Sequence, residues 1–148
     1  MQNYKAAGII FYRYQFISSL KKTFLQVYLQ YEYRLNKWSH FGGKRENYDK
    51  NSFETAIREM VEEIDVSCYN IVEFLKYNKL EKKYFSKSKM IVYYVDASKI
   101  TDSKLIEANW FTIDCLPNNI RSHIIEQLEE IKEYDFVNYF NMCKIASY

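Results

Sequence analysis

The stretch that decides the fold runs from residue 41 to residue 66 and reads FGGKRENYDKNSFETAIREMVEEIDV. Two of the chain's three glycines, Gly42 and Gly43, stand side by side in it, and three glutamates follow within five residues of one another. Glycine lets the backbone turn tightly or come close to another group. Clustered carboxylates repel one another unless a positive charge lies between them. The combination predicts a metal site between a glycine turn and an acidic helix.

The acidic helix is expected over residues 51 to 64. Asn51 is placed to cap it, and Glu54, three positions later, is placed to reach back in a capping box. Apolar residues at helical spacing predict its buried face: Phe53, Ala56, Ile57, Met60, Val61 and Ile64.

The opposite face of this helix carries the glutamates. Glu59, Glu62 and Glu63 fall within an arc of about 100°, because positions i, i+3 and i+4 share one face of a helix. A divalent cation that prefers oxygen ligands would turn their repulsion into ligation. Mg²⁺ or Mn²⁺ is therefore the expected ion.

The residues around the glycine pair are candidates for ligand contacts. We expect the pair to bring the loop close to the acidic face, where a backbone carbonyl adds a metal ligand and amide groups meet a phosphate. Lys44 and Arg45 follow the glycines directly and are candidate phosphate contacts. His40 precedes them and is a candidate substrate contact.

The remainder of the chain predicts a mixed β-sheet covered by helices. Strands are expected at residues 6–13 and 23–34, joined by a hairpin turn, and at 69–77, 89–97 and 109–114. A lysine-rich connection, residues 76–89, joins two of them. Helices are expected from residue 119 to about 131 and from 135 to 145. The order of strands and helices predicts an α/β (α+β) fold.

Composition points to one soluble domain covering residues 1–148. Apolar residues make up 48% and charged residues 27% of the chain, and no apolar run is long enough to cross a bilayer. No signal peptide and no membrane partner are expected, and the expected location is the cytoplasm. Cys68, Cys115 and Cys143 are widely separated and are expected to be buried thiols.

The same residues resemble a known family. Gly43 followed by Arg58-Glu59-Met60-Val61-Glu62-Glu63 resembles the Nudix box, which has a glycine, five residues, a glutamate, seven residues and then Arg-Glu-aliphatic-x-Glu-Glu-x-Gly-aliphatic. The flanking segments AAGIIFY, FGGKRE and NWFTIDCLP resemble the family's first strand, the loop entering the box and a late strand. The resemblance spans residues 6 to about 131. It implies an α/β/α sandwich with a mixed sheet, a catalytic helix after the Gly-Gly loop, and C-terminal helices.

Two departures from the box concern the loop and the end of the helix. Asp49 stands where the family has glutamate, and eight residues rather than seven separate it from Arg58. Asp65 stands where the family has glycine. Either Glu46 or Asp49 is expected to supply the loop carboxylate.

The resemblance also implies roles for individual residues. Glu59 and Glu63 would be the main metal ligands, with Glu62 as a third and the Gly43 carbonyl near the ion. Arg58 would pair with a loop carboxylate and hold the loop to the helix. Glu107 lies where some members supply a further acid. The implied reaction is attack of water on a diphosphate linkage, with Mg²⁺ neutralising charge on the phosphoryl oxygens.

Three functions are consistent with these residues. The first is an Mg²⁺-dependent Nudix pyrophosphohydrolase that cleaves a nucleoside diphosphate derivative. The second is mRNA decapping, as in enzymes of large DNA viruses, with capped RNA bound by the lysine-rich segment. The third is a catalytically impaired Nudix module that binds its ligand without hydrolysis. The sequence predicts neither the identity of the diphosphate nor the oligomeric state.

Overall fold

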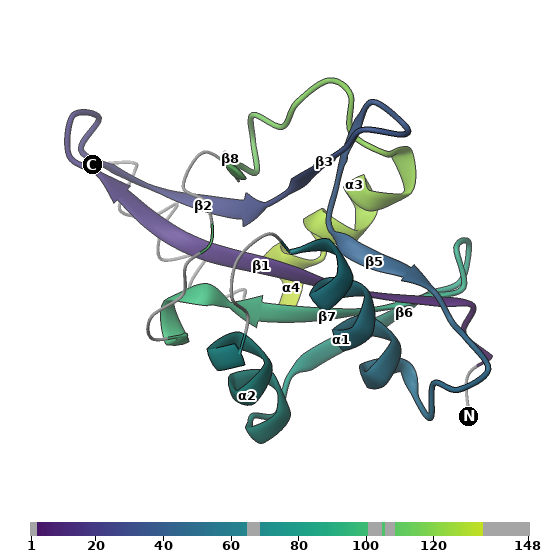
Figure 1. Cartoon of the computed structure of the whole chain (residues 1–148). Helices are drawn as coiled ribbons and strands as arrows, with labels where there is room; N and C mark the ends of the chain where they lie inside the picture. The colour runs from purple at the N-terminus through teal and green to yellow at the C-terminus, as the bar shows by residue number, and fades with distance from the viewer. Residues whose placement is uncertain (1–2, 65–68, 101–104, 106–108, 135–148) are drawn as a thin grey trace.

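The long strand β1 (Ala6–Ile17) forms the middle of the fold. A computed structural model describes residues 3–64, 69–100, 105 and 109–134. The other elements follow in chain order (Figure 1): β2 (Lys22–Tyr28), β3 (Gln30–Glu32), β4 (Lys37–Ser39), β5 (Phe41–Lys44), α1 (Ser52–Glu63), α2 (Tyr69–Tyr77), β6 (Glu81–Phe85), β7 (Met90–Asp96), the short 3-10 helix η1 (Ala97–Lys99), β8 (Trp110–Thr112), α3 (Ser122–Glu129) and α4 (Ile131–Tyr134).

The main sheet is mixed. Its strands run in the order β6-β7-β1-β2-β8, and β5 pairs with the first part of β1. β1 pairs parallel with β7 and antiparallel with β2 and β5, so its two halves serve different neighbours. β3 and β4 form a separate two-stranded hairpin. The expected α/β/α sandwich with a mixed sheet is confirmed.

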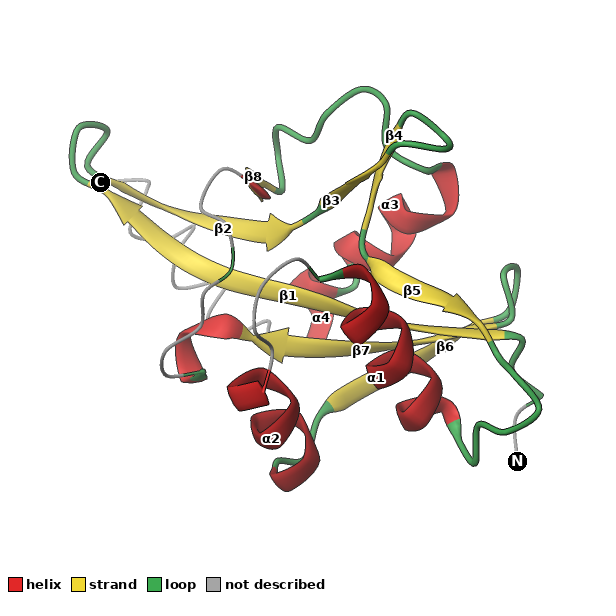
Figure 2. Ribbon diagram, viewed as in Figure 1, coloured by secondary structure: helices red, strands yellow, loops and turns green. Residues whose placement is uncertain are grey.

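Helices cover both faces of this sheet (Figure 2). Because side chains alternate along a strand, β1 contributes Ala7, Ile9 and Phe11 to one core and Ile10 and Tyr12 to the other. The first core includes Ala56 and Met60 of α1 and Ile71 and Leu75 of α2; the second includes Ile124 and Leu128 of α3. Fully burying one such large side chain stabilises the fold by about 1.5–3 kcal/mol.

Helix α1 begins where its cap predicts. The Asn51 side chain accepts a hydrogen bond from the Glu54 backbone N–H at 2.9 Å. The Glu54 carboxylate accepts from the Lys50 N–H rather than from Asn51, so only half of the expected capping box forms. Val61 was expected on the buried face but is 46% exposed, because the sheet contacts a narrower stripe centred on Ala56 and Met60.

Two expected elements are corrected. Residues 69–77 form helix α2, not a strand, because Ile71 and Leu75 are buried four positions apart, the spacing of one helix face. The lysine-rich connection contains strand β6, which pairs antiparallel with β7 at the edge of the sheet.

The glycine pair lies in a strand and not in a turn. Gly42 and Gly43 belong to β5, and no described glycine has a positive φ angle. The segment expected as one strand over 23–34 divides into β2 and β3 around the buried Leu29. Tyr28 is buried because α1 and its neighbours cover that side of the sheet.

Later in the chain the outcome is mixed. The helix expected from residue 119 is present as α3 and α4, with Ile120, Ile124, Leu128 and Ile131 all buried as its spacing predicts. Cys115 is exposed rather than buried, since it lies in the loop after β8. Asp65, Cys68, Glu107, Cys143 and the helix expected over 135–145 lie outside the described residues. Within the described part of the chain, no helix has the length and apolarity needed to cross a bilayer.

Candidate active site

The first part of the site is the contact between Glu59 and strand β5. A Cβ atom added to Gly43 would lie 2.3 Å from Cδ of Glu59, closer than any real side chain tolerates. A side chain at 43 would therefore displace the Glu59 carboxylate, which lies directly against the strand. The close approach expected from the sequence is present, although a strand provides it.

Glu63 lies against the preceding residue of the same strand. Its Oε1 accepts a hydrogen bond from the Gly42 N–H at 3.1 Å, and its Oε2 accepts one from the Gln30 side-chain amide. Burial raises the pKa of Glu63 to about 7, against the lowering effect of these two donors. The nearby negative charge of Glu59 raises it further.

Glu59 has a related environment. Burial raises the pKa of Glu59 above its ordinary value, and the adjacent Arg58 guanidinium opposes this rise. Two carboxylates thus share a partly desolvated space beside β5 in which their charged forms are disfavoured. A cation placed there would relieve this cost.

Glu62 does not lie in this partly desolvated space with Glu59 and Glu63. Its side chain is 56% exposed and lies 3.4 Å from Nη1 of Arg58. Within the ranges that the structure describes, no three His, Cys, Asp or Glu side chains are grouped to hold a metal ion. Mg²⁺ is usually held by one or two carboxylates, water and substrate phosphates rather than by a cage of side chains. Glu59 and Glu63 fit that kind of site, with the substrate as a further partner.

Arg58 ties the loop to the helix through Asp49. Its Nε and Nη2 donate to the two Asp49 oxygens at 3.1 and 2.9 Å, and Nη2 also donates to the Lys44 carbonyl at 2.9 Å. Asp49 accepts further bonds from the Thr55 hydroxyl and the Glu46 N–H, both at 2.9 Å. The Arg58 guanidinium holds the pKa of Asp49 far below its usual range. Of the two candidate loop acids, the structure therefore pairs Asp49 with Arg58.

This pair involves the residue that departs from the box. Asp49 is one methylene shorter than glutamate, and its side chain is only 3% exposed. Its carboxylate nevertheless reaches Arg58 from the longer loop. Glu46 contributes its backbone N–H and not its carboxylate.

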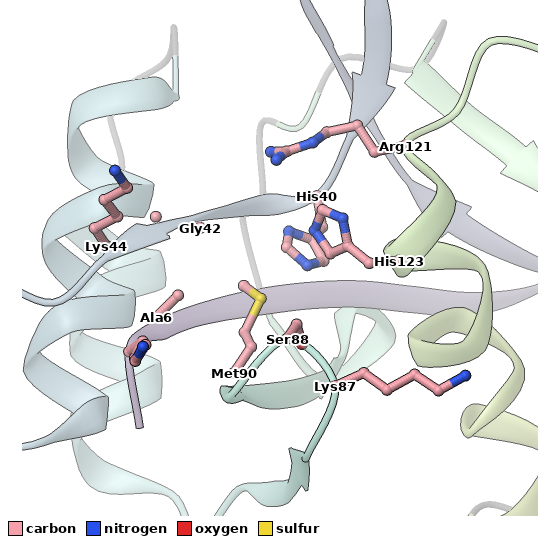
Figure 3. Close-up of a pocket in the computed structure, with 11 residues that line it drawn as sticks. Ala6, His40, Gly42, Lys44, Lys87, Ser88, Met90, Arg121 and His123 are labelled. Atoms are coloured by element: carbon pink, nitrogen blue, oxygen red, sulfur yellow. The ribbon is translucent and has the colours of Figure 1, made fainter. Parts of the chain in front are cut away.

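A pocket of about 530 Å³ lies on the other side of β5 (Figure 3). Its size is typical of sites for small ligands. It is lined by residues of β1, β5, the β6–β7 turn and the start of α3: Lys5, Ala6, His40, Gly42, Gly43, Lys44, Lys87, Ser88, Met90, Arg121 and His123. Figure 3 shows the side chains of His40 and His123 near its centre, with Arg121 above them.

The candidate substrate residues divide between this pocket and its surroundings. His40 and Lys44 line it. Arg45 does not, because its guanidinium lies over the Tyr4 ring, 4.6 Å from the ring centre.

Helix α3 holds the His40 side chain in place. Its Nε2 lies 2.7 Å from Oε1 of Gln127, and because an amide oxygen only accepts, Nε2 carries the proton. Burial lowers the pKa of His40 to about 4, so the ring is neutral at pH 7. Its Nδ1 is buried and has no hydrogen-bond partner among the described residues.

Several residues of the site have no signal in the sequence. Gln30 comes from the end of a strand and belongs to no motif. His123 belongs to no motif, yet its ring lies 6.5 Å from that of His40. Arg121 and Ser88 join the pocket only because α3 and the β6–β7 turn pack beside β5.

Comparison with known proteins gives a consistent fold. The family model described as NUDIX domain matches residues 14–133. No curated protein matches the chain. Among solved structures, a mutT/nudix family protein from Listeria innocua superposes with a TM-score of 0.55 at 12% identity, covering 95% of this chain and 98% of that one.

Two further structures are similar at lower scores. A Nudix hydrolase from M. smegmatis, RenU, has a TM-score of 0.49 at 12% identity, covering 87% of this chain and 86% of that chain. C. elegans Ap4A hydrolase has a TM-score of 0.44 at 17% identity, covering 97% and 96% of the two chains. Of these three structures only the Listeria innocua protein exceeds a TM-score of 0.5, and at 12% identity it supports the fold alone.

Proposed function

Because the chain belongs to the Nudix family, whose hydrolases act on diphosphate bonds, we propose that it is an Mg²⁺-dependent pyrophosphohydrolase of a nucleoside diphosphate derivative. Mn²⁺ is the alternative ion. The observation that carries the proposal is the placement of Glu59 and Glu63, two partly buried carboxylates of α1, against the adjacent glycines of β5.

These carboxylates would hold the ion together with a backbone carbonyl. The carbonyl of Gly42 is better placed for this than that of Gly43, which was expected from the sequence. The Gly42 N–H points to Glu63, and in an antiparallel ladder the N–H and C=O of one residue point to the same side. The Gly42 carbonyl therefore faces the helix edge, whereas that of Gly43 faces β1. When bound, the ion would neutralise charge on the phosphoryl oxygens during attack by water.

The remaining residues support this arrangement. Arg58 fixes the loop through Asp49 and contacts Oε1 of Glu59 at 3.1 Å, which orients that carboxylate. Lys44 stands at the end of β5, where it would contact substrate phosphate. Glu62 is exposed and would take an outer position. Arg45 and Glu46 have no role in this proposal.

No separate observation favours mRNA decapping. The lysines of β6 lie on an edge strand, where exposed lysines protect a sheet from pairing with other chains. Lys83 is also paired with Glu130 at 2.7 Å. Edge protection therefore explains the lysine-rich segment without RNA.

The test is hydrolysis of a substrate panel with Mg²⁺ or Mn²⁺. The panel contains nucleoside diphosphate derivatives, dinucleoside polyphosphates, diphosphoinositol polyphosphates and capped RNA. We expect metal-dependent release of a phosphorylated product from the nucleotide derivatives and none after chelation. Metal-dependent ligand binding without product on prolonged incubation would contradict the proposal and favour a binding module.

A further inference from the structure

The pocket on the far side of β5 is strongly cationic. Four of its lining residues are Lys or Arg, two are His, and none is Asp or Glu. Lys5, Lys44, Lys87 and Arg121 come from four distant parts of the sequence. None of these four forms an ion pair with a carboxylate in the described part of the chain. Their positive charges are therefore not neutralised by a described carboxylate, and Figure 3 shows Arg121 extending over the pocket while the ends of Lys44 and Lys87 point away from its centre.

The wall of the pocket also contains polar atoms without partners. The Ser88 hydroxyl is buried and makes no hydrogen bond to the described residues. Nδ1 of His40 is also unpaired, but as the acceptor nitrogen of a neutral ring it needs a donor such as water or a protonated phosphate oxygen. Unpaired buried polar atoms destabilise a protein unless a ligand or water satisfies them. Figure 3 shows both residues in the same pocket, below Arg121. Two independent features, charge and unmet hydrogen bonding, thus mark one location.

The chemistry of these groups favours a phosphate. A lining with several cations and no carboxylate concentrates an anion, and Arg pairs with phosphate through two parallel hydrogen bonds. A hydroxyl such as that of Ser88 donates to a phosphate oxygen. An uncharged ligand, such as a nucleobase, would leave these cations without a partner.

The position of the pocket relates it to the carboxylates. Gly42 and Gly43 both line the pocket, while Gly42 also donates its N–H to Glu63 and Gly43 borders Glu59 on α1, so the two sites share one strand. A ligand held by both sites would therefore run along β5 near Lys44 and place an anionic group in the pocket.

We propose that this pocket is a phosphate-binding subsite, so that the substrate carries a further phosphoryl group beyond the diphosphate that is hydrolysed. Dinucleoside polyphosphates and nucleoside diphosphate derivatives phosphorylated at their far end have this chemistry. The substrate assignment rests on the proposed function, whereas binding of the anion to the pocket does not.

The first experiment measures the pocket without hydrolysis. Tripolyphosphate is titrated into the protein by calorimetry with chelator present, so that no divalent ion contributes. We expect Arg121→Gln to weaken its binding at least tenfold. Arg34→Gln, which removes the same charge from the exposed β3–β4 turn, should leave binding unchanged.

Ser88→Ala provides a variant that does not change charge. Because its hydroxyl has no partner in the free protein, we expect an unchanged or higher Tm together with weaker tripolyphosphate binding. Circular dichroism checks that each variant is folded. Absence of tripolyphosphate binding, or equal binding by the Arg121 and Arg34 variants, would overturn the proposal.

The second experiment links the pocket to the substrate. KM is measured for dinucleoside compounds with two and with four bridging phosphates. Arg121→Gln should raise KM at least fivefold more for the longer bridge than for the shorter one. An equal change for both compounds would overturn the substrate assignment. If neither compound is hydrolysed, the proposed function fails while the calorimetry still decides the subsite.

Discussion

The two faces of strand β5 differ in charge. On the α1 side, Gly43 lies against Glu59 and Gly42 donates its N–H to Glu63. On the α3 side, the same strand borders a pocket lined with Lys, Arg and His and without an acid. Adjacent residues of one strand therefore separate an anionic site from a cationic one.

This difference shows why two small residues stand together. An extended strand presents successive residues to opposite sides, so each face of β5 has one glycine and therefore no side chain at that position. At Gly42 an added Cβ would lie 2.8 Å from the Met90 methyl, and at Gly43 it would lie 2.3 Å from Glu59. The glycine pair thus serves two different sites rather than one turn.

The largest expected effect comes from removing the anionic side. Glu63→Gln keeps the hydrogen bond from Gly42 but removes the carboxylate charge, and we expect kcat to fall about 1,000-fold. The fold should be retained, because the substitution removes a buried carboxylate whose charged form is disfavoured in the folded protein. Steady-state kinetics and thermal unfolding check this.

Glu62→Gln is the matched control for this variant. It removes an equal charge from a side chain that is largely exposed, and we expect kcat to fall by less than about tenfold. Parental turnover in Glu63→Gln would show that the anionic face is not catalytic.

The second effect concerns the support of that face. Asp49→Ala leaves the partly buried Arg58 without its main partner and should lower the free energy of unfolding by about 3 kcal/mol. Chemical denaturation measures this. Glu46→Ala, which keeps the N–H that Asp49 uses, should stay within about 0.5 kcal/mol of the parent. A similar loss in both variants would mean that the pair does not anchor the loop.

A third test compares the glycines directly. Gly43→Ala should displace Glu59 and lower kcat about 100-fold, because small misplacements of catalytic groups are costly. Gly42→Ala should push Met90 into the pocket and raise KM more than it lowers kcat. Steady-state kinetics of the two variants measure this difference between the faces of β5. The same change in kcat and KM for both variants would contradict it.

The smallest effect is the pH dependence of stability, which has opposite signs on the two faces. Burial raises the pKa of Glu63 to about 7, so its stabilising protonated form is lost as pH rises from about 4.5 through 7. Burial lowers the pKa of His40 to about 4, so stability is lost as pH falls from about 6.5 toward 4.

Because the two windows overlap and the two effects have opposite signs, they largely offset each other between about pH 4.5 and 6.5, so thermal unfolding between pH 4 and 9 in chelator should separate them in Glu63→Gln, where the His40 loss at low pH remains. Added Mg²⁺ should raise Tm by a few degrees at pH 8 and less at pH 5, because the ion binds the deprotonated carboxylates. Glu63→Gln should remove most of the alkaline loss. A magnesium effect that is independent of pH would contradict this assignment.

The parts of the fold that the sequence predicts are those with a strong period. Helix α1 has a cap and an apolar stripe of several turns, and β1 and β7 have long apolar stretches. Residues 69–77 contain apolar residues compatible with both periods, so the sequence predicts a strand where the structure has helix α2 with Ile71 and Leu75 buried on one face.

The candidate site divides in the same way. The acidic residues share one helix and are visible as a motif, although the helix geometry alone does not show that Glu62 turns toward Arg58. The cations of the pocket lie about 40 residues apart in the sequence, at Lys5, Lys44, Lys87 and Arg121. Only the packing of β1, β5, the β6–β7 turn and α3 brings them together, and no local pattern encodes that packing.

The central claim is that the carboxylates beside β5 bind a divalent cation. Anomalous diffraction from crystals soaked in Mn²⁺ tests it most directly. The account predicts one strong peak between Glu59, Glu63 and the Gly42 carbonyl, and its disappearance in Glu63→Gln crystals. A structure with both carboxylates turned to solvent and no peak between α1 and β5 would contradict it.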